Sequence, residues 1–132
     1  MTANQNNPII RIKDLGKAYT TGDGPFIALK DINIDIYRGE FLGITGKSGA
    51  GKTTLLNMIT GVSALTSGDV RFFEDGDPAG VSIQTLDENA LAQWRGQNLG
   101  IVYQSFELLP SLNLVKNVML PPDFLGTYHP VV

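Results

Sequence analysis

The sequence predicts an α/β fold in which an antiparallel β subdomain at the N-terminus precedes a core with parallel strands. Three features predict it: two early segments rich in alternating apolar residues, a short and almost continuous apolar run, and a glycine-rich loop that leads into an amphipathic helix. The chain has 132 residues, of which 42% are hydrophobic and 17% charged. A single packed domain is therefore expected rather than a disordered segment.

The N-terminal part is predicted to form two paired strands behind a polar tail of residues 1–8. Ile9–Leu15 is rich in β-branched residues, and Ala28–Tyr37 places isoleucines at alternate positions, as expected for a strand with one face in water. Between them, Gly16–Pro25 contains glycine and proline breakers and is predicted to be a loop. The two strands are expected to run antiparallel.

The next three elements are predicted to belong to the core. Phe41–Ile44 is a short apolar run, as expected for a strand buried on both faces. Lys52–Thr60 carries its apolar residues on one side of a helix, and Gly61 is well placed to end that helix. Asp69–Phe73 is predicted to be a further strand.

A short helix is predicted after the loop at residues 74–82. Thr85 and Glu88 have the spacing of a capping box, so we expect a helix that runs to about Arg95 and is closed by Gly96. Trp94 is interpreted as the core anchor of this helix, and ligand stacking is the alternative.

The last clear strand is predicted at Leu99–Tyr103. Beyond it, Pro121, Pro122 and Pro130 leave the C-terminus without a predicted element. The single histidine, His129, cannot build a metal site alone and is interpreted as a solvated tail residue.

The composition excludes several classes of function. Ten basic and thirteen acidic residues give a net charge of −3, which argues against a protein that binds nucleic acid without regard to sequence. No cysteine is present, so disulfides, thiolate zinc sites and thiol nucleophiles are excluded. Neither a signal peptide nor an apolar run long enough to cross a bilayer is seen. A cytosolic protein, or one held at a membrane by partners, is expected.

One motif carries chemistry. The segment from Gly46 to Thr53 matches the pattern G-x-x-x-x-G-K-[ST], between a predicted strand and a predicted helix as this phosphate loop requires. Its glycines let the backbone approach phosphates, its N–H groups form an anion nest, Lys52 reaches the β- and γ-phosphates, and the Thr53 hydroxyl ligates Mg²⁺. The expected cofactors are ATP and Mg²⁺. The candidate cofactor-binding residues in this segment are Gly46, Lys47, Ser48, Gly49, Ala50, Gly51, Lys52, Thr53 and Thr54.

Further segments narrow the family, because kinases, GTPases and transport ATPases all use a phosphate loop. From Ile9 to Leu120 the sequence resembles the nucleotide-binding subunits of ATP-binding cassette (ABC) transporters. Its last part looks most like the branch that serves lipoprotein release and macrolide export. The segments that carry the resemblance, besides the phosphate loop, are Lys17–Tyr19, Leu29–Ile32, Arg38–Phe41, Thr66–Val70, Leu99–Phe106, Leu108–Leu112 and Asn117–Val118.

This resemblance implies a P-loop NTPase core of the ABC ATPase type and roles for two more residues. Tyr19 would stack on adenine, with an ordinary loop tyrosine as the alternative. Gln104 would contact Mg²⁺ and the attacking water and link the nucleotide to the membrane partner, with a polar residue that ends a strand as the alternative. The implied partners are a transmembrane permease subunit and a second ATP-binding subunit, with the chain on the cytoplasmic face of the inner membrane.

Several parts of the family pattern are not found. No strand ending in Asp-Glu, no LSGGQ segment and no switch histidine is present, and Val118–Asp123 contains two prolines that exclude a central strand. Residues 9–132 are therefore predicted to be a partial ABC-type nucleotide-binding domain, truncated after the glutamine loop and unable to hydrolyse ATP alone. A non-catalytic nucleotide-binding remnant is the alternative. Lys47 and Lys116 depart from the residues usual in the family.

Overall fold

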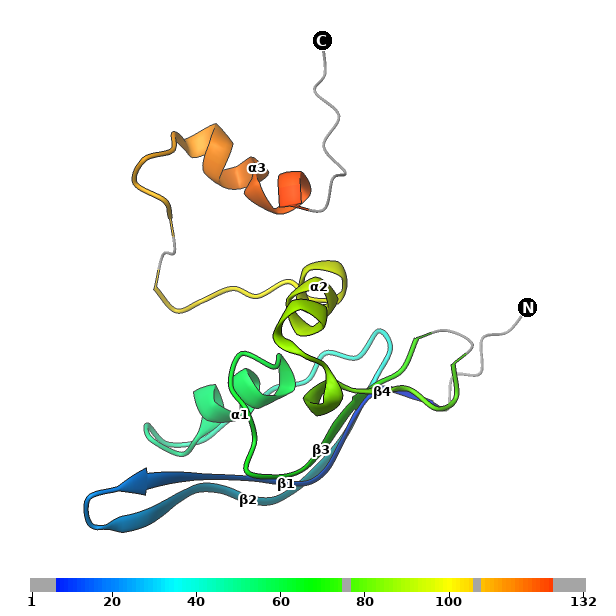
Figure 1. The fold of residues 1–132 in the computed structure, drawn as a ribbon, viewed down its shortest axis with the longest axis vertical. Helices are drawn as coiled ribbons and strands as arrows, with labels where there is room; N and C mark the ends of the chain where they lie inside the picture. The colour runs from blue at the N-terminus through cyan, green and yellow to red at the C-terminus, as the bar shows by residue number, and fades with distance from the viewer. Residues whose placement is uncertain (1–6, 75–76, 106–107, 125–132) are drawn as a thin grey trace. The chain divides into compact units, whose positions relative to one another are not determined.

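The computed structural model describes residues 7–74, 77–105 and 108–124, with backbone only over residues 121–124. The chain divides into two compact units, Met1–Asp87 and Glu88–Val132. The first unit contains an antiparallel sheet and helix α1, and the second contains helices α2 and α3 (Figure 1). The predicted phosphate loop and Tyr19 lie in the first unit, whereas Gln104 lies in the second.

Two long strands form the centre of the first unit. Strand β1, Pro8–Thr21, pairs antiparallel with β2, Gly24–Tyr37, so the predicted pairing is confirmed. The predicted loop at Gly16–Pro25 is wrong, because the ladder continues to the pair Thr21↔Gly24. Gly24, with φ 111°, takes up the turn at the tip of the hairpin. The breakers therefore end the hairpin and do not interrupt its strands.

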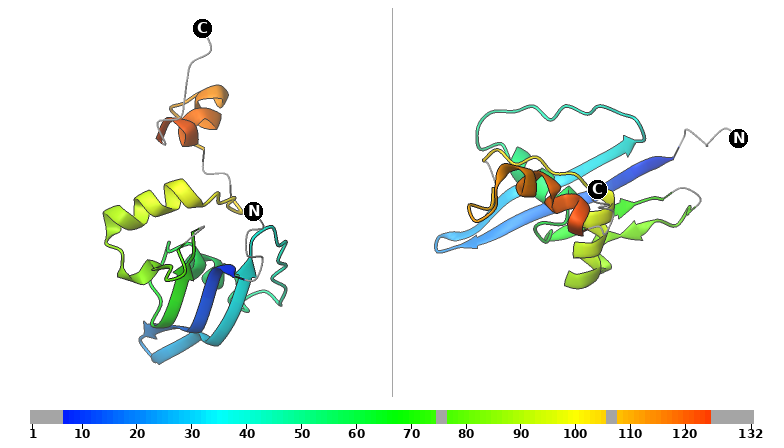
Figure 2. Two further views of the ribbon diagram at one scale, coloured as in Figure 1. Left: turned by 90° about the vertical axis from the view of Figure 1, so that its right-hand side faces the viewer. Right: turned by 90° about the horizontal axis from the view of Figure 1, so that it is seen from above.

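Strand β3, Ser67–Phe72, pairs with the other side of β1, and β4, Val81–Ser82, pairs with β3. All pairings are antiparallel, and the sheet order is β2-β1-β3-β4 (Figure 2). Helix α1, Lys52–Ile59, confirms the predicted helix, and Gly61 follows its end with φ 66°. The buried hydrophobic residues of this unit are Ile12, Leu15, Leu29, Leu55, Met58, Ile59, Val70, Phe72 and Ile83.

A glycine in the turn before β3 lets two backbones meet. Gly68 has φ 89°, and a Cβ atom there would overlap the carbonyl oxygens of Lys13 and Asp14. Asp14 itself has φ 49° and lies where the β1–β3 register shifts between Lys13 and Gly16. The Thr66-Ser67-Gly68 segment that supports the family resemblance thus has a structural reason, because only glycine fits against this bulge.

Two predicted core strands are not strands in the structure. Phe41–Ile44 and Leu99–Tyr103 have no strand geometry, and Phe41 and Val102 are each 99% exposed. A strand exists only through hydrogen bonds to a neighbouring strand, and within the described ranges no residue pairs with either segment. Both apolar runs are therefore unpaired segments that are largely exposed, with only Ile44 and Leu99 half-buried.

The second unit begins with α2, Glu88–Asn98, in which Gly96 is an interior residue rather than the predicted end. The predicted capping box is also wrong. The Thr85 hydroxyl donates to the Ser82 carbonyl at 2.8 Å, in a 3₁₀ turn over Ile83–Thr85. Because α2 begins at Glu88, Thr85 lies before its N-cap position and Glu88 is not the third helical residue that a capping box requires. Trp94 is 8% exposed, as expected for a core anchor.

The C-terminal part contains a helix, α3, Leu114–Phe124, that the prolines had argued against. The Asn113 side chain accepts from the Lys116 N–H at 2.9 Å and caps the helix. Asn117 fixes the preceding loop, because its amide oxygen accepts from Leu109 N–H at 2.8 Å and its amide nitrogen donates to Leu109, Leu112 and Asn113 carbonyls. These bonds order the first turns, and the prolines fall only in the second half. Phe106, His129 and Pro130 lie outside the described residues.

Candidate phosphate-binding site

The phosphate loop connects an exposed segment to the first turn of α1. Gly49 and Gly51 have φ of 79° and 89°, the left-handed region that glycine adopts without strain. A Cβ atom at Gly51 would lie 3.0 Å from the Leu29 side chain and 3.1 Å from the Ala28 carbonyl, both on β2. The loop is therefore seated on the sheet at Gly51, and a larger residue there would push it away.

Lys52 closes the loop on itself. Its ammonium group donates to the carbonyl oxygens of Gly46, at 2.8 Å, and Lys47, at 2.7 Å. A Cβ atom at Gly46 would lie 3.3 Å from the Ala50 side chain and 3.8 Å from that of Lys52, so the two ends of the loop are close. The Ala50 N–H also donates to the Lys47 carbonyl, at 3.1 Å. These contacts hold the lysine head across the loop, within reach of an anion that the loop would enclose.

The start of α1 is suited to an anion. Gly51 is the N-cap and makes no side-chain cap, and the first turn contains no acidic residue. The N–H of Leu55 makes an intrahelical bond to Gly51, at 2.8 Å, so the N–H groups of the first three helical residues, Lys52–Thr54, are not spent within the helix. Together with the helix dipole they attract negative charge. The glycine cradle, the lysine and the helix start fit a polyphosphate.

The residues near the loop supply few ligands for a divalent cation. Thr53 is exposed in the first turn of α1, where its hydroxyl is available. Within the described part of the chain, no three His, Cys, Asp or Glu side chains are grouped so as to hold a metal ion. Mg²⁺ is commonly bound by one or two protein oxygens together with substrate phosphates. A cation at this loop would thus depend on the nucleotide for most of its ligands.

Tyr19 lies near the end of β1, on the same pair of strands that seats the phosphate loop. It pairs with Phe26 across the hairpin, and two residues earlier Lys17 pairs with Leu29, the residue against which Gly51 packs. Tyr19 is 42% exposed, and the Lys17 ammonium lies 5.0 Å from the centre of its ring. The structure therefore brings the predicted base platform and the phosphate loop onto adjacent parts of one hairpin.

Gln104 is an exposed bend residue in the second unit, after the extended Leu99–Tyr103 segment. Its predicted contact with Mg²⁺, like the one predicted for Thr53, stays a prediction.

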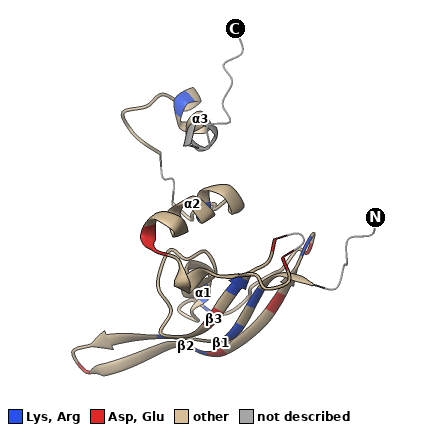
Figure 3. Cartoon of the chain, turned by 45° about the vertical axis from the view of Figure 1, so that its right-hand side comes forward, with Lys and Arg blue, Asp and Glu red and all other residues tan. Residues whose placement is uncertain are grey.

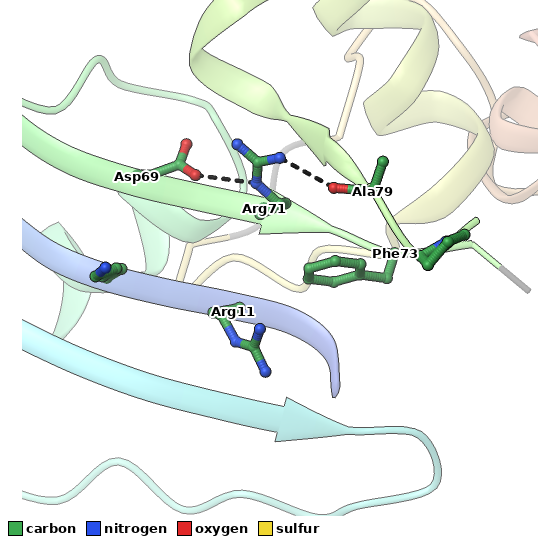
Figure 4. Close-up of a pocket in the computed structure, with 7 residues that line it drawn as sticks. Arg11, Asp69, Arg71, Phe73 and Ala79 are labelled. Carbon is green, nitrogen blue, oxygen red and sulfur yellow. Dashed lines mark hydrogen bonds and ion pairs between the residues drawn. The ribbon is translucent and has the colours of Figure 1, made fainter. Parts of the chain in front are cut away.

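A hollow of about 440 Å³ lies over the polar face of the sheet (Figure 4). Lys and Arg positions, blue in Figure 3, lie on β1 and β3, and Arg11, Lys13 and Arg71 line this hollow. Arg11 is paired with Asp35 at 3.0 Å and 3.2 Å, and this hydrogen bond and charge raise the pKa of Arg11. Arg71 is paired with Asp69 at 3.2 Å and with the Ala79 carbonyl at 2.9 Å. Because these cations already have anionic partners, the phosphate loop is the stronger candidate site.

Sequence patterns did not identify the contacts that support Tyr19. Lys17 donates to the Ala64 carbonyl at 2.6 Å, and Thr66 bonds to Gly16 and Ala18 of β1. In the sequence, the Lys17-Ala18-Tyr19 segment indicates a site only through its tyrosine. A cation two residues from an aromatic on one strand face is the signal that could have indicated the pair.

Comparison with known proteins gives consistent matches. A family model described as ABC transporter matches residues 29–129. The chain is 40% identical over 119 residues to the macrolide export ATP-binding/permease protein MacB of Shigella flexneri, a match that covers 90% of this chain and 17% of that protein. These matches confirm the resemblance predicted from sequence, including its macrolide-export branch.

Solved structures agree. A dimeric bacterial ABC transporter cassette, MJ0796, matches with a TM-score of 0.79 and 35% identity over 93% of this chain and 50% of the cassette. The same cassette in a post-hydrolysis state bound to ADP and Pi matches with a TM-score of 0.79 and 34% identity, over the same shares of the two chains. The predicted fold class is confirmed. The chain thus spans half of the solved cassette and 17% of the curated relative. In the described residues, no helix has the length and apolar character needed to span a bilayer.

Proposed function

The chain belongs to the ABC transporter family, and from this premise we propose that residues 9–132 form part of a nucleotide-binding domain that binds Mg-ATP to power transport or export across the inner membrane. The predicted polar tail of residues 1–8 is wrong at its last residue, because Pro8 is the first residue of β1 and pairs with Tyr37. The observation that carries the proposal is the phosphate loop, in which two left-handed glycines, a lysine held across the loop and an uncapped helix start converge. The similarity to ATP-binding/permease proteins supports this function rather than a non-catalytic remnant.

Each loop residue has a distinct role in the proposal. The N–H groups between Gly49 and Thr54 donate to phosphate oxygens and orient them. The glycines of the loop allow the phosphates to come close to these N–H groups. The Lys52 ammonium leaves a loop carbonyl and donates to the phosphates instead, which exchanges a neutral acceptor for a charged one. Thr53 offers its hydroxyl to Mg²⁺, whose charge would offset that of the phosphates. Lys47, Ser48 and Ala50 complete the loop backbone.

Two residues outside the loop complete the proposed site. Tyr19 stacks against the adenine base, for which its partly exposed ring on the neighbouring strand pair is suited. Gln104 contacts Mg²⁺ and the attacking water and links the nucleotide to the membrane partner. The latter role rests on the resemblance of its flanking residues to the family's glutamine loop.

The proposed partners are a transmembrane permease subunit and a second ATP-binding subunit, with the chain on the cytoplasmic face of the inner membrane. The relative named as an ATP-binding/permease protein and the dimeric state of the solved cassette support these partners. The overall negative charge of the chain argues against nucleic acid as a partner.

Isothermal titration with Mg-ATP tests the proposal. Lys52→Ala should weaken binding about ten- to hundredfold, because it removes a charge-assisted hydrogen bond to phosphate. Lys30→Ala is the matched control, since Lys30 is an exposed lysine on β2 whose charge faces Asp31 at 4.0 Å. Lys30→Ala should bind as the parent chain does.

Equal binding by the parent and Lys52→Ala would contradict the assignment of the loop. The same samples test turnover. Phosphate release by the parent should match that of Lys52→Ala, because phosphoryl transfer also needs a carboxylate that orients water, and no strand ending in Asp-Glu is found in the sequence. Sustained release that disappears in Lys52→Ala would show that the chain supplies its own catalytic carboxylate.

A further inference from the structure

Lys17 makes two contacts that together fix the position of the Tyr19 ring. Its ammonium lies 5.0 Å from the centre of that ring and donates to the Ala64 carbonyl at 2.6 Å. Lys17 and Tyr19 are two residues apart on β1 and so project from the same face of the strand. Lys17 is half-buried, and the hydrogen bond to Ala64 holds its head group beside the ring.

The carbonyl that holds Lys17 belongs to a segment that is bonded to the same stretch of β1. Thr66 donates its backbone N–H to Gly16, at 2.9 Å, and its hydroxyl accepts from the Ala18 N–H, at 3.0 Å. This segment follows α1, the helix that begins at the phosphate loop. Helix α1 therefore has the phosphate loop at its start and, after its end, the segment that is hydrogen-bonded to β1 beside Tyr19.

A second connection joins the same two places directly. Gly51 packs against Leu29 on β2, and Leu29 is the cross-strand partner of Lys17. Lys17 is therefore linked to the phosphate-loop region in two ways. It donates a hydrogen bond to Ala64, which follows α1, and it pairs with Leu29, which contacts Gly51. If Lys17 holds the Tyr19 ring, the distance between that ring and the Gly46–Thr53 loop is fixed as well.

We infer that Lys17 is a positioning residue for nucleotide recognition: it holds Tyr19 through a cation–π contact so that the ring meets the base of a nucleotide whose phosphates lie in the Gly46–Thr53 loop. This inference rests on the proposed function. The Lys17 ammonium lies over one face of the ring, and Tyr19 is 42% exposed, which leaves ring surface for the base. The lysine contributes by limiting the ring's motion before binding, so less conformational freedom is lost when the base stacks.

The test compares two ligands that share the phosphates and differ in the base: Mg-ATP and magnesium tripolyphosphate, titrated into the full chain. Tyr19→Ala should weaken ATP binding about tenfold, and Lys17→Met should weaken it about two- to fivefold, with tripolyphosphate affinity unchanged in both. Lys17→Arg, which keeps the cation and the donor, should restore ATP affinity. In the Tyr19→Ala background, Lys17→Met should cause no further loss, because the ring it positions is absent.

Three results would overturn the inference. Lys17→Met could leave ATP affinity unchanged, it could weaken ATP and tripolyphosphate equally, or its effect could add fully to that of Tyr19→Ala. The second pattern, with a lowered melting temperature, would indicate a structural role only. Failure of the proposed function itself looks different, because both ligands would then bind Lys52→Ala as well as the parent, and that result would overturn both proposals.

Discussion

The strands of the antiparallel sheet and the two segments Phe41–Ile44 and Leu99–Tyr103 are all rich in apolar residues, but they differ in burial and in strand pairing. In the sheet, Ile12, Leu15 and Val70 are almost fully buried, and each strand is paired with a neighbour: β1 with β2 across one turn, and β1 with β3, which lies far from it in the sequence. In the apolar segments, Phe41 and Val102 are 99% exposed. The difference lies in the pairing, since the segments are apolar enough for strands but have no partner among the described residues.

This comparison shows what apolar sequence can and cannot specify. A hairpin such as β1–β2 contains both halves of its hydrogen-bond ladder, so local sequence is sufficient to form it. A strand buried on both faces of a parallel sheet obtains its partners only through long crossover connections. Its apolar run therefore indicates that the segment would be buried on both faces. The segment forms a strand only where neighbouring strands are present to pair with it.

The largest expected effect on the free energy of unfolding distinguishes a leucine of the sheet, Leu15, from one of the unpaired segment, Leu42. Leu15→Ala should lower the free energy of unfolding of the chain by about 2–5 kcal/mol, because Leu15 is fully buried in the sheet. Leu42→Ala, in the unpaired apolar segment, should change it by less than about 0.5 kcal/mol. Urea denaturation followed by circular dichroism measures both. A comparable loss in Leu42→Ala would show that the segment is packed and not exposed.

A smaller effect is expected where two backbones of the sheet meet. Gly68→Ala should destabilise the chain by about 1–3 kcal/mol, because it forces a left-handed φ on alanine and places Cβ against the carbonyls of Lys13 and Asp14. Gly22→Ala at the hairpin turn is the control, since a Cβ there meets nothing within 4 Å. The same denaturation assay should find Gly22→Ala unchanged or slightly more stable. Equal stability of Gly68→Ala and the parent would refute the role given to this glycine.

The smallest effect concerns self-association. Phe41→Ser should weaken association of the chain about tenfold, because a fully exposed phenylalanine on an unpaired segment offers both apolar surface and free backbone groups to another copy. Phe26→Ser is the control, since Phe26 is also exposed but lies on a paired strand. Sedimentation velocity over a concentration series distinguishes the two. If both variants weaken association alike, exposure alone and not missing pairing is responsible.

Local patterns predicted what local residues decide. The phosphate loop, α1 and the end of α1 at Gly61 follow from glycines, a lysine and an amphipathic stretch that act within a few residues of one another. The pairing of β1 with β2 followed from alternation. Helix α3 was missed because its prolines outweighed Asn113, although an asparagine before an apolar stretch is a recognised helix start.

Contacts between distant residues were not predictable in the same way. Lys17 binds a carbonyl 47 residues later, and Gly68 fits a bulge that begins more than 50 residues earlier in the chain, at Lys13. Neither relation leaves a periodic pattern, because each depends on how β1 and the segment after α1 are brought together. Unpaired apolar segments were likewise predicted as strands, since sequence shows their composition but not their neighbours.

Hydrogen–deuterium exchange measured by mass spectrometry, with and without Mg-ATP, can show whether nucleotide binds at the phosphate loop, because it localises the bound nucleotide on the chain. Amides of the peptide that covers Gly46–Thr54 should exchange more slowly when Mg-ATP is present, and Lys52→Ala should abolish that protection. The peptide that covers Leu114–Leu120 serves as the internal reference and should be unaffected. Protection elsewhere with none at Gly46–Thr54, or protection that persists in Lys52→Ala, would contradict a phosphate-binding role for this loop.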